Sequence, residues 1–157
     1  MIVVDNTVLT NFALVGRIDL LRVAIGGRNP CTTPAVKKEF DEGADRGLFA
    51  PTDIQWLPVV SLTPDEVSRL ENLSQGFGDG EAECIVVALA RGALLATDDL
   101  KTRKHVQQSG GKVTGTLGIL KGLVEDGHLS IEEGDRVLRA MIEEGYFSPV
   151  DSLTRLI

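Results

Sequence analysis

Two short hydrophobic runs in the chain end in aspartate. Asp5 follows residues 2–4, and Asp98 and Asp99 follow residues 94–97. Adjacent carboxylates repel each other and gain no packing energy, so they either cap the next helix in contact with water or face a positive charge. The first question that the sequence raises is which partner these carboxylates have.

Three glutamates occupy comparable places elsewhere in the chain. Glu39 lies in the second turn of the helix predicted after residues 31–33, and Glu81 and Glu83 lie in the first turns of a later predicted helix. Parallel sheets bind ligands outside the carboxyl ends of their strands, and right-handed crossovers bring these ends to one edge. The sequence therefore predicts that acids far apart along the chain face one cleft.

Each acid also has a purely structural explanation. Asp98 suits the cap of the following helix, Glu81 and Glu83 suit the positive end of a helix dipole, and Glu39 suits a solvent-facing position. Asp5 is the hardest to explain in this way, because an acid that ends a hydrophobic strand is partly buried and a buried carboxylate needs a partner.

Several carboxylates in one cleft raise each other's pKa and cannot all stay ionised without compensation. Mg²⁺ and Mn²⁺ prefer such oxygen ligands, and a pair of these ions can activate a water and stabilise the leaving oxygen of a phosphodiester. A zinc site is not expected, because Cys31, Cys84, His105 and His128 are isolated in the sequence. Each cysteine is expected to be a buried thiol.

The elements that must position these acids alternate between short strands and helices. Helix starts are marked by Thr33 before Pro34, by the capping box from Thr63 to Glu66, and by Ser130. Strands are predicted at 2–4, 31–33, 54–62, 93–97 and 112–114, and helices at 7–15, 18–25, from 34, 64–73, 83–91, 100–108, within 115–127 and from 131. This alternation predicts one α/β domain, residues 1–157, with a parallel, doubly wound sheet covered on both faces.

Composition narrows the class of protein further. The chain has 157 residues, 43% of them hydrophobic, and a net charge of −7. This charge argues against a protein that coats nucleic acid by its overall field, although a nuclease needs positive charge only along its substrate groove. No hydrophobic run approaches the length of a membrane span, and a cytoplasmic protein is expected.

Four segments, in this order and spacing, resemble a PIN domain: VVDNTVL, PAVKKEF, GDGEAECIVVALA and LLATDD, with Arg103 close behind. Together with the later GTLGIL segment they are similar to a small prokaryotic branch whose best-known relatives are VapC-type toxins. The resemblance implies a three-layer α/β/α fold with a mostly parallel central sheet and an endoribonuclease that depends on Mg²⁺ or Mn²⁺. It also implies an RNA substrate, a homodimer and a small antitoxin protein as partner.

The resemblance assigns roles to individual residues. Asp5 matches the first acid of the family, Glu39 the second and Glu83 the third. The fourth falls at Asp98 or Asp99, since the strand end selects the first and the family pattern selects the second. We expect the metal to be held by Asp5, Glu83 and one of this pair, with Glu39 either orienting a water or supporting the ligands from behind. Supporting or substrate-binding roles are expected for Asn6, Thr7, Glu81, Thr97 and Arg103.

Two further groups of residues have open interpretations. Lys101, Arg103 and Lys104 either contact substrate phosphates or form an ordinary solvated helix face, and Arg103 can instead bridge the crowded acids. Gly115 and Gly118 either form a phosphate-binding turn or, as the sequence favours, allow close helix packing. The apolar residues of the last helix and its end are expected in the core or at a dimer surface.

Other functions fit the sequence less well. A haloacid-dehalogenase-type phosphatase requires a second aspartate two residues after the first, where this chain has Thr7. A receiver domain requires a phosphoacceptor aspartate that has no counterpart here. The alternative that remains is a PIN fold without catalysis that acts as a binding or regulatory subunit, and metal binding distinguishes it from a nuclease.

Overall fold

The computed structural model describes residues 1–73 and 75–157, and its centre is a four-stranded sheet with the order β2-β1-β3-β4. The strands are β1 (Ile2–Val4), β2 (Pro30–Cys31), β3 (Leu94–Ala96) and β4 (Lys112–Thr114). Every neighbouring pair is parallel, and Val3 lies opposite Cys31 on one side and Leu95 on the other. All four carboxyl ends therefore lie at one edge of the sheet.

Eight α-helices surround the described sheet. They are α1 (Asn6–Leu14), α2 (Ile18–Ile25), α3 (Pro34–Asp45), α4 (Pro64–Asn72), α5 (Asp79–Arg91), α6 (Leu100–Gln108), α7 (Thr116–Glu125) and α8 (Ile131–Glu143). Short 3₁₀ turns follow α2 at Gly26–Arg28 and close the chain at Leu153–Arg155.

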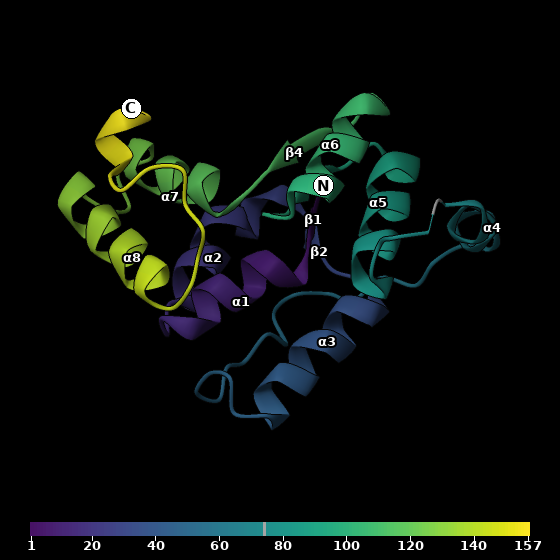
Figure 1. The fold of residues 1–157 in the computed structure, drawn as a ribbon, viewed down its shortest axis with the longest axis horizontal. Coiled ribbons are helices and arrows are strands. Elements are labelled where there is room, and N and C mark those ends of the chain that lie inside the picture. Colours follow the sequence, from purple (N-terminus) through teal and green to yellow (C-terminus); the bar gives the residue numbers. More distant parts are fainter. Residues whose placement is uncertain (74) are drawn as a thin grey trace.

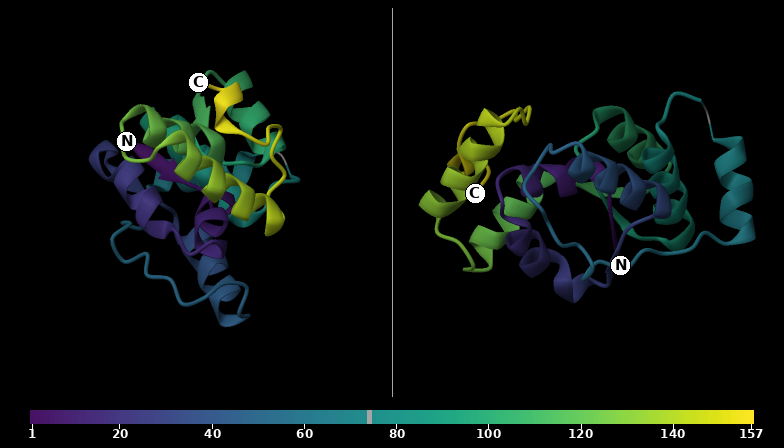
Figure 2. Two further views of the ribbon diagram at one scale, coloured as in Figure 1. Left: turned by 90° about the vertical axis from the view of Figure 1, so that its left-hand side faces the viewer. Right: turned by 90° about the horizontal axis from the view of Figure 1, so that it is seen from below.

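The chain reverses its direction across the sheet after β2, and this reversal places the helices in two layers. The chain passes from β1 to β2 in one direction and from β2 through β3 to β4 in the other, so right-handed crossovers put their helices on opposite faces. In Figure 1, α1, α2, α7 and α8 lie to the left of the sheet and α4, α5 and α6 to its right, and Figure 2 shows the same separation from below. The expected α/β/α fold is confirmed, with a wholly parallel sheet among the described residues.

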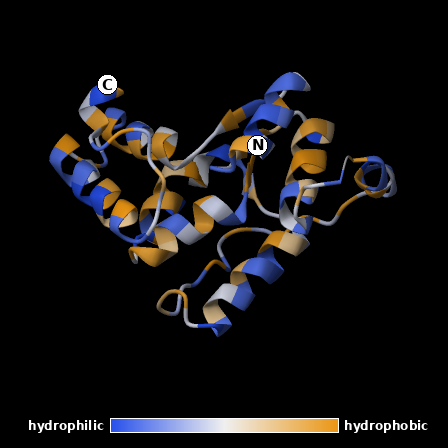
Figure 3. Cartoon of the chain, viewed as in Figure 1, coloured by the Kyte–Doolittle hydropathy of each residue, from blue (hydrophilic) through white to orange (hydrophobic). Residues whose placement is uncertain are grey.

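The most hydrophobic strands and helices form the core, and the hydrophilic ones lie outside it. The strand residues Val3, Val4 and Leu95 are fully buried, and α5 packs against β1 and β3. Figure 3 shows hydrophobic residues along the C-terminal part of α5, whereas α4, the outermost helix on that side, is mainly hydrophilic. Gly92 ends α5 with φ of +63°, a left-handed conformation that glycine adopts without strain.

Most predicted elements are present, and one is absent. The predicted caps at Thr33, Thr63 and Ser130 each accept the expected backbone hydrogen bond. The strand expected at 54–62 is wrong, because this described segment pairs with the sheet only through a bridge between Thr32 and Val59. Pro58 lies inside the segment and has no N–H to donate to a ladder.

Candidate metal site at the carboxyl edge of the sheet

Asp5 is held in a fixed orientation where β1 passes into α1. Its backbone N–H donates to Ala96 O at 2.9 Å, and its side chain caps α1 by accepting from Asn6 N at 2.8 Å. The hydroxyls of Thr97 and Thr7 donate to its second oxygen at 2.7 and 3.2 Å. The residue is only 1% exposed. Thr7 and Thr97, expected in a supporting role, thus orient the Asp5 carboxylate.

The two adjacent aspartates after β3 point to different places. Asp99 caps α6 by accepting from the backbone N–H and the hydroxyl of Thr102 at 2.8 and 2.7 Å. Asp98 instead accepts from Thr116 N at 2.8 Å and from Asn11 Nδ2 at 2.9 Å. It therefore ties the N-terminus of α7 and α1 to the end of β3, and α6 begins one residue later than a cap at Asp98 requires.

Glu39 reaches the same edge from α3. Its Oε1 accepts from Gly80 N, in the first turn of α5, at 3.0 Å. A Cβ atom on Gly80 would lie 2.8 Å from that oxygen, so the Glu39 carboxylate can take this position only beside a glycine. The sequence pattern did not single out Gly80 for this role, although GDGEAE places a glycine directly before the acids.

The two glutamates of α5 also separate. Glu81 accepts from Gly78 N at 3.0 Å in a capping box at the start of the helix. Glu83 turns towards α3, where its Oε1 accepts from Ala35 N at 2.8 Å. The structure therefore brings Glu81, rather than Glu83, towards the other acids.

Burial and the charges of neighbouring acids connect four of these carboxylates. Burial raises the pKa of Asp5 against the lowering effect of its hydrogen bonds, and the charge of Asp99 raises it further. Burial raises the pKa of Glu39 and of Glu81, and the charge of Asp5 adds to both effects. Glu81 also raises the pKa of Glu39, and Asp99 that of Glu81. We call these four residues, Asp5, Glu39, Glu81 and Asp99, the acidic cluster.

The acidic cluster fits a hard divalent cation by the chemistry of its donors. It offers only carboxylate oxygens, and three of its members carry a raised pKa that a cation would reverse. Among the described residues no three acid, histidine or cysteine side chains already converge on one point as metal ligands. Instead, Glu39, Glu81 and Asp99 each accept a backbone hydrogen bond.

The basic residues near this edge have defined contacts. Lys101 Nζ donates to Gly76 O at 2.8 Å and lies 4.8 Å from the centre of the Phe77 ring. Arg103 donates to Thr97 O at 2.9 Å, and the ion pairs of the described residues do not include it. Arg103 therefore does not bridge the acids here, and Lys104 is exposed on α6.

The glycines of the GTLG segment serve close packing. A Cβ on Gly115 would lie 2.5 Å from Asp98 Oδ1 and 2.9 Å from Arg103 Nη1. Asp98 already occupies the N-terminus of α7 through its bond from Thr116 N. A phosphate at this turn would have to displace the chain's own carboxylate, so the packing interpretation is the one that the contacts support.

A family model described as a PIN domain matches residues 1–157. The chain belongs to the PIN domain family, which generally includes nucleases that act on nucleic acid with divalent metals. No curated protein matches the chain. In the described part of the chain, none of the helices combines the length and the hydrophobicity that a bilayer crossing requires.

Proposed function

We propose that the protein is a metal-dependent endoribonuclease whose active site is the acidic cluster. The observation that carries the proposal is the crowding of carboxylates at this edge. Burial raises the pKa of Asp5, Glu39 and Glu81, the charge of Asp5 adds to the rise at both glutamates, and Asp99 adds to the rise at Asp5 and Glu81. The cluster lies between β1 and β3, where the strand order reverses and where doubly wound sheets bind their ligands.

Each residue of the site has a proposed role that follows from its position. Asp5, Glu81 and Asp99 would hold Mg²⁺ or Mn²⁺, which supplies charge for a hydrolytic water and for the leaving oxygen of a phosphodiester. Glu39 would orient that water and accept its proton, because its raised pKa brings the carboxylate closer to the range of a general base. Thr7 and Thr97 keep Asp5 in place through their hydroxyl donors.

Cleavage of RNA with matched variants tests this proposal. We expect the wild type to cut single-stranded RNA with Mn²⁺ and not with EDTA, and Asp5→Asn to lower the rate at least about 100-fold. Asp41→Asn is the control, because Asp41 pairs with Lys37 on the surface of α3 and should cut normally. A variant Asp5→Asn that cuts at the wild-type rate would remove the acidic cluster from the mechanism.

The second candidate is a PIN-fold subunit that binds partners without catalysis. One observation favours it: the described acids accept backbone hydrogen bonds rather than converging as metal ligands. Titration with Mn²⁺ separates the two, because a nuclease binds the ion in the micromolar to millimolar range and a degraded site does not.

The cellular context is proposed from the resemblance to VapC-type toxins. We take the protein to be a cytoplasmic homodimer whose site is blocked by a small antitoxin encoded beside it. Light scattering tests the dimer. Co-expression with each neighbouring small reading frame tests the antitoxin, since the true partner would co-purify and suppress RNA cleavage.

A further inference from the structure

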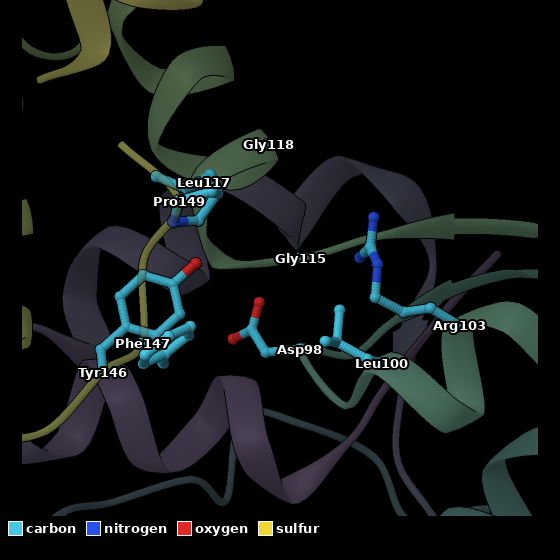
Figure 4. A pocket seen from close by; sticks show the side chains of 9 residues that line it. All are labelled: Asp98, Leu100, Arg103, Gly115, Leu117, Gly118, Tyr146, Phe147 and Pro149. Atoms are coloured by element: carbon cyan, nitrogen blue, oxygen red, sulfur yellow. The ribbon is translucent and has the colours of Figure 1, made fainter. Parts of the chain in front are cut away.

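A cavity of about 280 Å³ opens beside the acidic cluster. Its lining comes from the end of β3, from α6, from the start of α7 and from the segment after α8. Figure 4 shows the Asp98 carboxylate in the middle, with Tyr146 and Phe147 on one side and Leu100 and Arg103 on the other. None of the cluster residues and neither of their threonine supports lines this cavity.

Its two apolar walls are unusually exposed. Phe147 is 93% exposed and Leu100 is 78% exposed, more than any other large hydrophobic side chain of the described residues. Both belong to the rim of the same cavity and lie on opposite sides of Asp98. A flat apolar ligand that enters between them would remove the exposed surface of both from water.

Two charged side chains line the cavity, a carboxylate that accepts and a guanidinium that donates. Asp98 is held by Thr116 and Asn11, and Arg103 donates through Nη1 to Thr97 O. Burial and the charge of Asp98 raise the pKa of Tyr146, whereas Arg103 lowers it. Both charged groups therefore lie near the phenol, and the cavity combines aromatic rings with a carboxylate and a guanidinium.

This cavity continues towards the acidic cluster. A neighbouring hollow of about 410 Å³ shares Asp98, Tyr146 and Phe147 with it and is also lined by Asp99 and Asn6. Asp99 is a cluster member, and Asn6 adjoins Asp5. A chain that passes its backbone along Asp99 would thus have the first cavity within reach of its next side group.

We propose that the cavity binds one unpaired nucleobase of the RNA, next to the phosphate that is cut, with the base stacked on Phe147. This inference rests on the proposed function. Bases of single-stranded RNA are commonly splayed out, stacked on aromatic rings and hydrogen-bonded at their edges, which matches the ring, donor and acceptor found here. A second copy of the chain is the less favoured occupant, because the cavity is lined by two charged side chains and has the size of one ring system rather than of a helix face.

Binding measured without cleavage tests the proposal. Fluorescence anisotropy of a labelled single-stranded RNA in EDTA should show Phe147→Ala binding about tenfold more weakly than the wild type and Phe147→Trp at least as tightly. The effect should be absent for duplex RNA, whose bases are not available. Leu48→Ala is the matched control, because Leu48 is 58% exposed on another part of the surface. The exposure of Phe147 means that its variants should fold normally.

Three results would overturn the nucleobase site. They are equal affinity of wild type and Phe147→Ala for single-stranded RNA, an equal loss for single-stranded and duplex RNA, and a lower oligomeric mass of Phe147→Ala in light scattering, which would show a second copy on this surface. Failure of the two proposals is distinguishable. Unchanged binding with intact Mn²⁺-dependent cutting removes only the base site, and weaker binding of Phe147→Ala without any cutting by the wild type removes only the hydrolysis.

Discussion

Glu81 and Glu83 are two positions apart on α5 and therefore point to different sides of the helix, about 200° apart. Glu81 faces the other acids of the cluster, and its pKa is raised by burial and further by the charges of Asp99 and Asp5. Glu83 faces α3 and accepts from Ala35 N at 2.8 Å. One helix thus carries an acid with a proposed catalytic role and an acid that joins two helices.

Neutral variants of these two glutamates separate the roles. Glu81→Gln should lower Mn²⁺-dependent RNA cleavage about 100-fold, because an amide is a poor ligand for a hard cation. Glu83→Gln should keep more than about a tenth of the activity, since a glutamine oxygen can still accept from Ala35 N. Rates measured at matched protein concentration check this, and the reverse order of the two variants would return the third acid to Glu83.

Part of this site could be predicted from the sequence, residue by residue. The strand-end rule placed Asp5 at the sheet edge, and the helix start at Thr33 placed Glu39 near it. The family resemblance selected Glu83 as the metal ligand and Glu81 as a supporting residue. The hydrophobic pattern could not test that choice, because α5 is buried on several sides at Cys84, Ile85, Val86 and Val87 and does not single out one face. The pair after β3 stayed open because the strand end selects Asp98 and the family pattern selects Asp99.

Between α3 and α5, the position of the Glu39 carboxylate depends on Gly80. An added Cβ would lie 2.8 and 2.9 Å from the two carboxylate oxygens of Glu39. That carboxylate is the end of a flexible side chain, so it can move aside at little cost in stability. The consequence is that a methyl group at this position displaces a proposed catalytic group without unfolding the helix.

Gly80→Ala should therefore lose activity while it keeps its stability. We expect RNA cleavage to fall at least about tenfold and the free energy of unfolding to change by less than about 1 kcal/mol. The control is Gly122→Ala in α7, where an added Cβ meets nothing within 4 Å. That variant should cut normally and gain about 0.5–1 kcal/mol. Full activity of Gly80→Ala would argue against a role for Glu39.

A buried ion pair fixes α4 to α5. Arg91 donates to both oxygens of Glu66, at 2.8 and 2.9 Å, and the Glu66 side chain is 4% exposed. The hydrogen bonds from Arg91 lower the pKa of Glu66 to about 2, from a usual value of 4.5. A carboxyl with a lowered pKa in the folded state stabilises the protein above its unfolded pKa, and this contribution is lost as pH falls towards the folded value.

Removal of Arg91 should thus have a cost that depends on pH. Arg91→Met should lower the free energy of unfolding by about 3 kcal/mol at pH 7, and the cost should shrink between about pH 5 and pH 2 as Glu66 takes up a proton. Arg69→Met, which breaks an exposed pair with Asp65, should cost less than about 1 kcal/mol. Urea unfolding across this pH range checks both, and a constant cost for Arg91→Met would contradict the ion-pair explanation.

The helices and their starts were easier to predict from the sequence than the contacts between them. Thr33 and the box from Thr63 to Glu66 cap helices by local chemistry, so α3 and α4 begin where the pattern indicates. The strand predicted for 54–62 was wrong because pairing with the sheet depends on tertiary contacts. This segment pairs only through the bridge between Val59 and Thr32. The contact between Glu39 and Gly80 joins residues 41 positions apart and has no local pattern.

For the whole molecule, the reversal of strand order between β1 and β3 is the feature that assembles the site. It places Asp5 and Thr97 side by side, joined by a hydrogen bond of 2.7 Å across 92 residues of sequence. Helices α3 and α5 then bring Glu39 and Glu81 to the same edge. The chain carries a net charge of −7, and this edge concentrates part of it in one buried and three half-buried carboxylates.

Calorimetric titration with Mn²⁺ tests most directly whether the four acids form one ion site. The wild type should bind the ion in the micromolar to millimolar range, and Asp5→Asn and Asp99→Asn should each lose most of this affinity, since each removes a charged oxygen ligand. Asp98→Asn should bind as the wild type does, because Asp98 faces Thr116 and Asn11. Equal binding by the wild type and Asp5→Asn, or a loss confined to Asp98→Asn, would show that the cation site lies elsewhere.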